Sequence, residues 1–406
     1  MVKIAVLGHG VVGSGVIEVL QKNAQSIAKK AAQEIEVKYI LDLRDFPDLP
    51  YSDLFVKDYD IILKDPEVSI VVEVLGGLHP AYDFSKAALE AGKSVVTSNK
   101  EVVAEKGAEL LKIAKENNLN YLFEASVGGG IPIIRPLNQC LAANELHEIY
   151  GILNGTTNYI LSEMIHKGKT FEDALADAQA KGYAERNPAA DVEGIDACRK
   201  ICILASLAFG RHVYPKNIQA EGITRVSLTD VRYASAAGGA IKLIGQAREL
   251  EDGRVFAAVS PCIVMQENPM AGVEDVFNAI LVRGDAIGDV MFYGRGAGKL
   301  PTASAVVADV IDEVKHLSAR KYLYWVDAGD GFIADHAEVS SRFFLRAEGS
   351  FEIPAAFGKV VPVCAEGVEG ETAFLTESIN EGEFDRARAA LEQAGVKVLA
   401  VYRVID

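Results

Sequence analysis

The chain has 406 residues, and half of them are hydrophobic, so about two or three domains can each bury an apolar core. Its formal net charge of −16, with no Lys or Arg run longer than two residues, excludes the concentrated basic face that nucleic-acid binding needs. Five cysteines without paired metal-ligand spacing indicate a reducing cytoplasm, and no apolar run approaches the roughly 20 residues that span a membrane.

The first apolar run, Val2 to Leu7, predicts a strand that leads directly into a glycine-rich turn and then a helical pattern. In this order, the glycines of a Gly-x-Gly-x-x-Gly turn let the backbone approach a pyrophosphate at the helix N-terminus. We therefore predict a dinucleotide site, with no role for the imidazole of His9. The predicted cofactor-binding residues of this turn are Gly8, Gly10, Val11, Val12 and Gly13.

Strands and helices then alternate. The predicted strands cover 36–41, 68–74, 94–97 and 121–124, and the predicted helices cover 81–91 and 101–116. This alternation indicates an α/β Rossmann domain over residues 1–130, with a mostly parallel sheet and ligands at the carboxyl ends of its strands. Gly76 and Lys100 lie at such ends. A lysine that opens a helix opposes the helix dipole, so Lys100 favours a bound anion at this position.

The end of the second strand, Leu41-Asp42-Leu43-Arg44-Asp45, bears on the choice of cofactor. An acid at this place would hold a ribose 2′-hydroxyl, as in NAD binding, whereas Arg44 could meet the 2′-phosphate of NADP. We favour NADP and leave NAD open.

Polar residues are unusually dense between Gly151 and Lys200, where the chain reads GILNGTTNYIL and then GYAERNPAADVEGIDACRK. This density predicts a site that holds a small zwitterion and moves a proton. A helix beginning near Val192 would place Asp196 and Lys200 on one face, because they are four residues apart. The alternative is an ordinary exposed ion pair. The opposing apolar stripe of this helix would be Ile195, Cys198, Cys202 and Ala205.

Further elements are predicted along the rest of the chain. Strands at 148–153 and 255–259, in a domain where we expect antiparallel strand pairing, accompany a helix at 197–209, and a helix at 303–314 follows the glycines of 294–298. After about residue 340, strands at 343–347, 373–376 and 397–404 and a helix at 384–393 form a separate pattern.

Six motifs occur in one order along residues 1–320, and together they resemble the homoserine dehydrogenase family. They are GHGVVG, EVLGG with Pro80, SNK, EASVGGGIP, GILNGTTNYIL and GYAERNPAADVEGIDACRK. The resemblance implies reversible NAD(P)-dependent interconversion of L-homoserine and L-aspartate 4-semialdehyde, in the biosynthesis of threonine, methionine and isoleucine. It also implies a substrate-binding and dimerisation domain over 131–302, a return to the cofactor domain over 303–320, and a homodimer or higher homo-oligomer. The alternatives are another amino-acid or semialdehyde dehydrogenase and a non-catalytic NAD(P)-binding sensor whose C-terminal module detects an amino acid.

The same resemblance implies roles for individual residues. Lys200 matches the proton donor and acceptor, and Lys100 matches a lysine that touches the nicotinamide region and the substrate. The pKa of a free lysine is about 10.4, so a catalytic lysine needs burial or a neighbouring cation to lower it. Glu185 matches the residue that binds the substrate amino group, and Asp191 and Asp196 match acids of the same pocket. Gly182 and Gly298 join Gly76 as expected cofactor contacts, although Gly298 could simply be a flexible entry to a helix.

Two further segments resemble parts of the family. EASVGGGIP resembles its sodium loop, in which Glu124, Val127, Gly129 and Ile131 offer main-chain carbonyls; the alternative is a simple domain hinge. Residues 340–406 resemble a small ACT domain, but Gly349 to Pro354 replaces the usual turn and first helix. We therefore expect a shortened ACT-like unit and assume no effector such as threonine.

Overall fold

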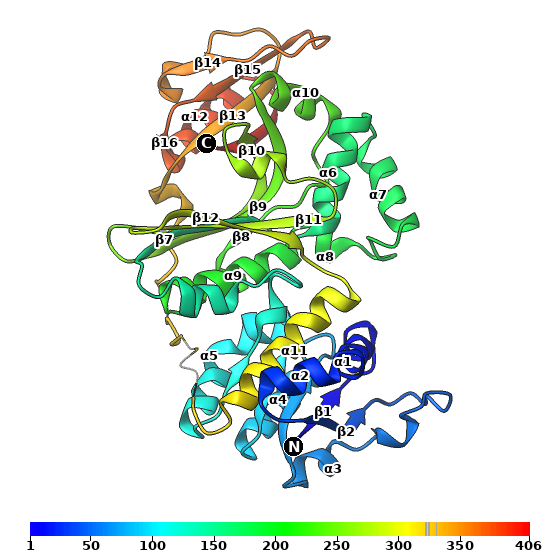
Figure 1. The fold of residues 1–406 in the computed structure, drawn as a ribbon. Coiled ribbons are helices and arrows are strands. Elements are labelled where there is room, and N and C mark those ends of the chain that lie inside the picture. The colour runs from blue at the N-terminus through cyan, green and yellow to red at the C-terminus, as the bar shows by residue number, and fades with distance from the viewer. Residues whose placement is uncertain (321–322, 324, 330) are drawn as a thin grey trace.

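Two β-sheets organise the chain, and helices pack against their faces (Figure 1). The computed structural model describes residues 1–406 except 321, 322, 324 and 330. The first sheet has six strands in the order β3-β2-β1-β4-β5-β6, and its paired strands are parallel. They are β1 (Val2–Leu7), β2 (Ile35–Leu41), β3 (Phe55–Val56), β4 (Val68–Glu73), β5 (Ser94–Thr97) and β6 (Tyr121–Leu122).

Helices cover this sheet, as expected for a Rossmann domain. They are α1 (Val11–Lys22), α2 (Ala24–Ala31), α3 (Tyr59–Lys64), α4 (Ala81–Glu90), α5 (Lys100–Glu116) and, returning from much later in the chain, α11 (Lys299–Lys315). Alternate side chains of β1 point to opposite faces of the sheet. Ile4 and Val6 pack with α1 and α11 on one face, and Ala5 and Leu7 pack into the core on the opposite face. Both faces are therefore buried, which explains why these strands read as continuous apolar runs.

The second sheet has eleven strands and is mainly antiparallel, as expected for the middle of the chain. Its main order is β12 (Gly288–Arg295), β11 (Phe277–Gly284), β7 (Leu146–Ile152), β9 (Gly239–Glu249), β10 (Val255–Met265), β17 (Val398–Ile405), β13 (Ser340–Glu348), β15 (Glu371–Thr376) and β14 (Val360–Pro362). Two short strands lie off this path: β8 (Gln219–Ala220) pairs with β10, and β16 (Ile379–Asn380) pairs with β13.

Further helices pack on the second sheet or on one another. They are α6 (Gly155–Lys167), α7 (Phe171–Ala180), α8 (Ala189–Val192), α9 (Ile195–Phe209), α10 (Leu228–Ala236) and α12 (Glu381–Gln393). Helix α9 lies between the two sheets, where its apolar side packs on β7, β9 and β10 and its other neighbour is α5 (Figure 1). Among the described residues, no helix is both long and apolar enough to cross a lipid bilayer.

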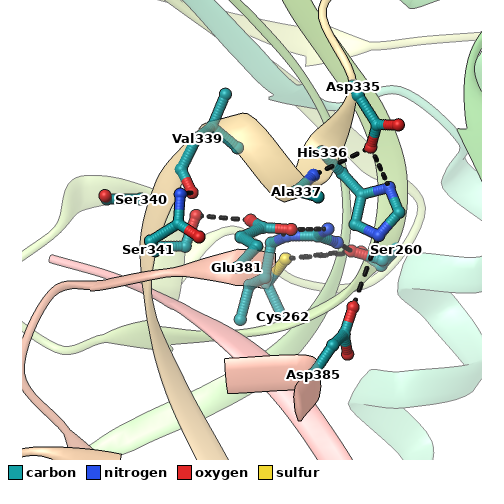
Figure 2. A network of polar contacts seen from close by, with 12 residues as sticks. Ser260, Cys262, Asp335, His336, Ala337, Val339, Ser340, Ser341, Glu381 and Asp385 are labelled. Carbon is teal, nitrogen blue, oxygen red and sulfur yellow. Dashed lines mark hydrogen bonds and ion pairs between the residues drawn. The ribbon is translucent and has the colours of Figure 1, made fainter. Parts of the chain in front are cut away.

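The C-terminal elements form where the sequence predicts them, but they are not detached from the middle of the chain. Strand β17 pairs parallel with β10, in the register Cys262 to Arg403, so one sheet runs through both parts. The Arg403 guanidinium forms a two-pronged ion pair with Glu381 at 2.9 and 2.6 Å and donates to Ser260 Oγ at 3.3 Å. Figure 2 shows Glu381 and Ser260 at this junction, beside His336 between Asp335 and Asp385.

Candidate active site

A buried ion pair lies at the start of α9. Lys200 Nζ donates to Asp196 Oδ2 at 2.8 Å, and the two residues are only 7% and 5% exposed. The i, i+4 prediction is therefore confirmed, and the alternative of an exposed pair is wrong. The helix begins at Ile195 rather than near Val192, because left-handed Gly194 separates α9 from the short helix α8.

The apolar stripe of α9 is confirmed for Cys198, Cys202 and Ala205, which are buried. It is wrong for Ile195, which is 38% exposed. Ile195 is the first residue of the helix, and this end of α9 carries the polar cluster around Asp196.

Asp196 also binds a second lysine, which lies on α5, a helix of the first sheet. Lys100 Nζ lies 2.9 Å from Asp196 Oδ1, so the two carboxylate oxygens hold two different ammonium groups. Lys100 opens α5, whose first amides are capped by the side chain of Asn99. The residues next to the two lysines, Glu101 and Arg199, also pair with each other at 2.9 Å. These contacts join α5 to α9 and bring together the two lysines predicted from the sequence.

Asn154 completes this cluster, which we define as Lys100, Asn154, Asp191, Asp196 and Lys200. Its Nδ2 donates to Asp191 Oδ1 at 2.7 Å and to Asp196 Oδ2 at 2.9 Å, while its Oδ1 caps α6 by accepting from Thr157. Lys200 Nζ also donates to the carbonyl of Leu153 at 2.8 Å. Sequence reasoning assigned no catalytic role to Asn154, because its spacing also suits an ordinary helix cap.

The charges of the cluster shift its pKa values in different directions. Burial lowers the pKa of Lys200, and nearby Lys100 lowers it further, although Asp196 opposes both effects. Asp196 raises the pKa of Lys100. Burial would raise the pKa of Asp196, but the two ammonium groups outweigh it and hold the pKa below its usual value. Burial raises the pKa of Asp191. Lys200 is thus the amine of this pair that more readily gives up its proton.

The structure does not bring Glu185 or Gly182 into contact with this cluster. Gly182 follows the end of α7, and Glu185 lies in an exposed loop whose Tyr183 carbonyl accepts a hydrogen bond from Thr156 at 2.7 Å. Within the described part of the chain, the Glu185 carboxylate has no hydrogen bond or ion pair. It is therefore available to a ligand.

The glycine turn after β1 has the geometry that a dinucleotide site requires. A Cβ on Gly13 would lie 2.0 Å from the carbonyl oxygen of Gly8, so only glycine permits this approach of α1 to the turn. Gly10 and Val11 are exposed at the end of the helix, and a Cβ on Gly10 would meet nothing within 4 Å. Val12, the remaining predicted residue of the turn, is half-buried.

Asp42, at the end of β2, is already occupied by protein donors. Its carboxylate accepts from the His9 amide and from the amide and guanidinium of Arg44, at distances of 2.8 to 3.0 Å. The Arg44 side chain holds the pKa of Asp42 below its usual range. Arg44 Nη2, which is one of the two guanidinium nitrogens that donate to Asp42, also donates to the carbonyl of His9 at 3.1 Å, and these bonds fix the exposed guanidinium beside the glycine turn.

The imidazole of His9 is buried within an aromatic cluster, so its ring is a packing element of the turn. Phe46, Tyr51 and Phe55 surround it with ring centroids 4.7, 5.8 and 5.1 Å away, and Tyr51 Oη lies 3.1 Å from Nε2. Sequence reasoning missed this packing, since the partners lie on a connection with no periodic pattern.

Gly298 and Gly129 lie where two chain segments cross between the two sheets. Gly298 precedes α11, which packs on α1. Gly129, at φ +57°, lies so close to Gly296 that a Cβ would be 2.2 Å from its carbonyl oxygen, and Gly130 donates to the carbonyl of Arg295 at 3.1 Å. Gly76 lies in the loop after β4, and a Cβ there would meet nothing within 4 Å.

The loop from Glu124 to Ile131 is buried except at Gly130. The main-chain oxygens of Val127, Gly129 and Ile131 accept no backbone hydrogen bond from the described chain, and Glu124 opens the short 3-10 helix Glu124–Ser126. The side chain of Glu124 has another function: it accepts from the amides of Ile133, Ile134 and Arg135 at 2.6 to 2.9 Å. Strand β6 ends at Leu122, so the strand predicted through Glu124 is two residues too long.

Two family models match the chain. One, described as homoserine dehydrogenase, matches residues 132–311, and the other, described as homoserine dehydrogenase, NAD binding domain, matches residues 8–124. A homoserine dehydrogenase from Pseudomonas aeruginosa is 44% identical over 416 residues, covering 100% of this chain and 93% of its own length. One from Bacillus subtilis is 36% identical over 90% of this chain and 85% of its own length.

Solved structures give the same likeness. A homoserine dehydrogenase from Thiobacillus denitrificans aligns with a TM-score of 0.88 and 35% identity, covering 100% of this chain and 98% of that one. A hyperthermophilic archaeal homoserine dehydrogenase mutant in complex with NADPH aligns with a TM-score of 0.66 and 30% identity, covering 77% of this chain and 97% of that one.

Proposed function

Because this chain belongs to the homoserine dehydrogenase family, which interconverts L-homoserine and L-aspartate 4-semialdehyde with NAD(P), we propose that Lys200 moves the proton of that reaction. The observation that carries this proposal is the carboxylate of Asp196 shared by Lys100 of α5 and Lys200 of α9, two helices that pack against different sheets. When bound, the nicotinamide supplies or accepts the hydride. In oxidation, the neutral amine of Lys200 takes the hydroxyl proton; in reduction, its ammonium form gives that proton to the aldehyde oxygen.

The other polar residues of the site bind the amino-acid substrate beside the amine of Lys200. Lys100 stays protonated beside Asp196 and attracts the substrate carboxylate. The unpartnered carboxylate of Glu185 attracts the substrate amino group, with Asp196 as a further contact and Asp191 lining the pocket. Asn154 fixes the orientation of both aspartates.

The cofactor residues we propose are the glycine turn with Val11 and Val12, together with Gly76, Gly182, Gly298, Lys100 and Arg44. NADP is the favoured cofactor. The carboxylate of Asp42 already accepts hydrogen bonds from His9 and Arg44, which disfavours binding of a ribose 2′-hydroxyl. The exposed Arg44 guanidinium lies beside the glycine turn, where it can bind a 2′-phosphate. The NADPH complex of the archaeal relative is consistent with this choice.

Sodium fits the Glu124 to Ile131 loop. The carbonyl oxygens of Val127, Gly129 and Ile131, which have no backbone donor in the described chain, are together with that of Glu124 hard oxygen ligands of the kind that suits this cation. A cation here would fix the crossing between the cofactor and substrate domains.

We assign residues 1–130 with 303–320 to the cofactor domain, 131–302 to the substrate domain and 340–406 to the ACT-like unit. A homodimer is supported by exposed apolar residues on and beside edge strand β12, namely Ile287, Met291 and Tyr293. A cytoplasmic location is supported by the five cysteines, none of which is in a disulfide.

Two substitutions separate chemistry from binding. Lys200→Met should lower kcat by about 10² to 10⁴-fold and leave the cofactor Kd nearly unchanged. Glu185→Gln should mainly raise the KM for homoserine, because its role is to bind the amino group. Rates with L-homoserine and either NADP or NAD, together with cofactor titration, measure both effects. Loss of cofactor binding in Lys200→Met would show that Lys200 is structural, and absence of turnover in the unmodified protein would favour a sensor.

A further inference from the structure

A buried carboxyl group lies directly beneath the cofactor edge of the first sheet. Glu73 is the last residue of β4, is 0% exposed and has no basic partner among the described residues. Burial raises its pKa to about 7, although hydrogen bonds from Thr97 and Leu75 oppose the rise. An apolar side chain at this position would avoid the cost of desolvating a carboxyl group. The hydrogen bonds of Glu73 therefore indicate what the group does.

Glu73 and Thr97 form one unit, because they are paired directly in the register of β4 and β5. Thr97 Oγ1 donates to Glu73 Oε2 at 2.6 Å, and the amide of Leu75 donates to Glu73 Oε1 at 2.7 Å. Thr97 Oγ1 in turn accepts from the amide of Asn99 at 2.9 Å. These hydrogen bonds form a chain that runs without a break from Leu75 through Glu73 and Thr97 to Asn99, and all of these residues except the half-buried Leu75 are buried.

Each end of this chain touches the catalytic machinery. Leu75 lies against the glycine turn, since a Cβ on Gly8 would be 2.9 Å from Leu75 Cδ2. Asn99 caps α5 immediately before Lys100, and its Nδ2 also donates to the carbonyl of Gly77 at 2.8 Å. The loop 75–77 and the start of α5 are thus tied together twice.

We propose that Glu73 and Thr97 are positioning residues that hold the cofactor loop 75–77 and the α5 N-terminus in one fixed relation, so that Lys100 reaches Asp196 and the substrate. This deepens the proposed function and rests on the role given there to Lys100. Neither residue touches the reacting atoms. Both act through Lys100 and through the loop beside the glycine turn.

A matched pair at Thr97 tests the proposal. Thr97→Ser keeps the hydroxyl group. Thr97→Val keeps the shape of the side chain but removes the hydroxyl, so that Glu73 and Asn99 each lose a hydrogen bond. We expect Thr97→Val to lower kcat/KM for homoserine by about tenfold and Thr97→Ser to stay within about threefold. Thr376→Val is the control elsewhere: buried Thr376 accepts from the Phe343 amide at 3.0 Å in the C-terminal unit, so its loss should change stability but not kcat/KM.

A double-mutant cycle distinguishes positioning from general damage. If Thr97 acts through Lys100, the effect of Thr97→Val on kcat/KM should be largely absent in a Lys100→Met background. Full additivity, or equal kcat/KM for Thr97→Val and Thr97→Ser per folded molecule, would overturn the proposal. If Thr97→Val does not fold, Glu73→Gln takes its place in the same cycle. Retention of full activity by Lys100→Met alone would instead refute the proposed function.

Discussion

At the scale of single residues, the central feature is a carboxylate shared between two unlike lysines. Asp196 holds Lys100 with one oxygen and Lys200 with the other, but only Lys200 is deeply buried. Lys100 has its pKa raised, and Lys200 has its pKa lowered. These shifts favour a fixed positive charge on Lys100 and support the proposal that Lys200 changes its protonation state during turnover.

The direction of these shifts predicts the pH dependence of the enzyme. Oxidation of homoserine needs the neutral amine of Lys200, so kcat/KM should rise as pH rises through a pKa that lies below the ordinary value of lysine. Reduction of the semialdehyde needs the ammonium form and should fall through the same range. Lys100→Met removes a nearby positive charge, which should raise the pKa of Lys200 and move both limbs to higher pH.

Profiles of kcat/KM against pH in both directions measure this effect, with the unmodified protein as reference. A limb that stays in place or moves to lower pH in Lys100→Met would contradict the assignment of Lys200 as the titrating group.

At the scale of elements, local sequence patterns predicted most of the helices and strands and, within the site, the pairing of Asp196 with Lys200. The parallel strands and the Asp196–Lys200 spacing follow from runs and periods that a sequence displays. The partnership of Lys100 with Asp196 and the pairing of β10 with β17 join distant segments, and no local pattern specifies such a register. The prediction that Ile195 belongs to the buried stripe of α9 was wrong, because the period of apolar residues does not show where the contact between a helix and its sheet ends.

The crossing of two segments between the sheets gives a prediction at this scale. Gly129→Ala should destabilise the fold strongly, because the new Cβ would overlap the carbonyl of Gly296 and φ is +57°. Gly288→Ala is the matched control, with φ +69° but no atom within 4 Å of the new Cβ. We expect the control to cost about 1 to 2 kcal/mol for its left-handed backbone and Gly129→Ala to cost about 1 to 3 kcal/mol more. Urea unfolding compares them; equal losses would show that the crossing can relax freely.

At the scale of the whole molecule, the proposed active site lies between two sheets, and the C-terminal unit shares one of them. Helices α5 and α9 meet at the lysine cluster, so the site exists only where the cofactor and substrate parts are packed together. On the far side of the second sheet, Arg403 connects β17 to α12 and β10 through Glu381 and Ser260 (Figure 2).

Removing Arg403 should weaken the whole second sheet. Arg403→Met would leave Glu381, which is 2% exposed, without its ion-pair partner, at a cost of about 3 to 5 kcal/mol. Lys359→Met breaks the exposed pair with Glu377 and should change stability by less than about 1 kcal/mol. Chemical denaturation measures both, and similar values for the two variants would mean that water reaches Glu381.

The insertion of β17 between β10 and β13 also has a consequence for shortened versions of the chain. Without β17, the Cys262 to Val264 stretch of β10 would lose its parallel neighbour and present bare amide and carbonyl groups. Such an unpaired strand edge can pair with a strand from another molecule and start aggregation. A fragment that ends before residue 398 therefore needs substitutions to charged residues or proline along this edge of β10 to stay soluble at high concentration.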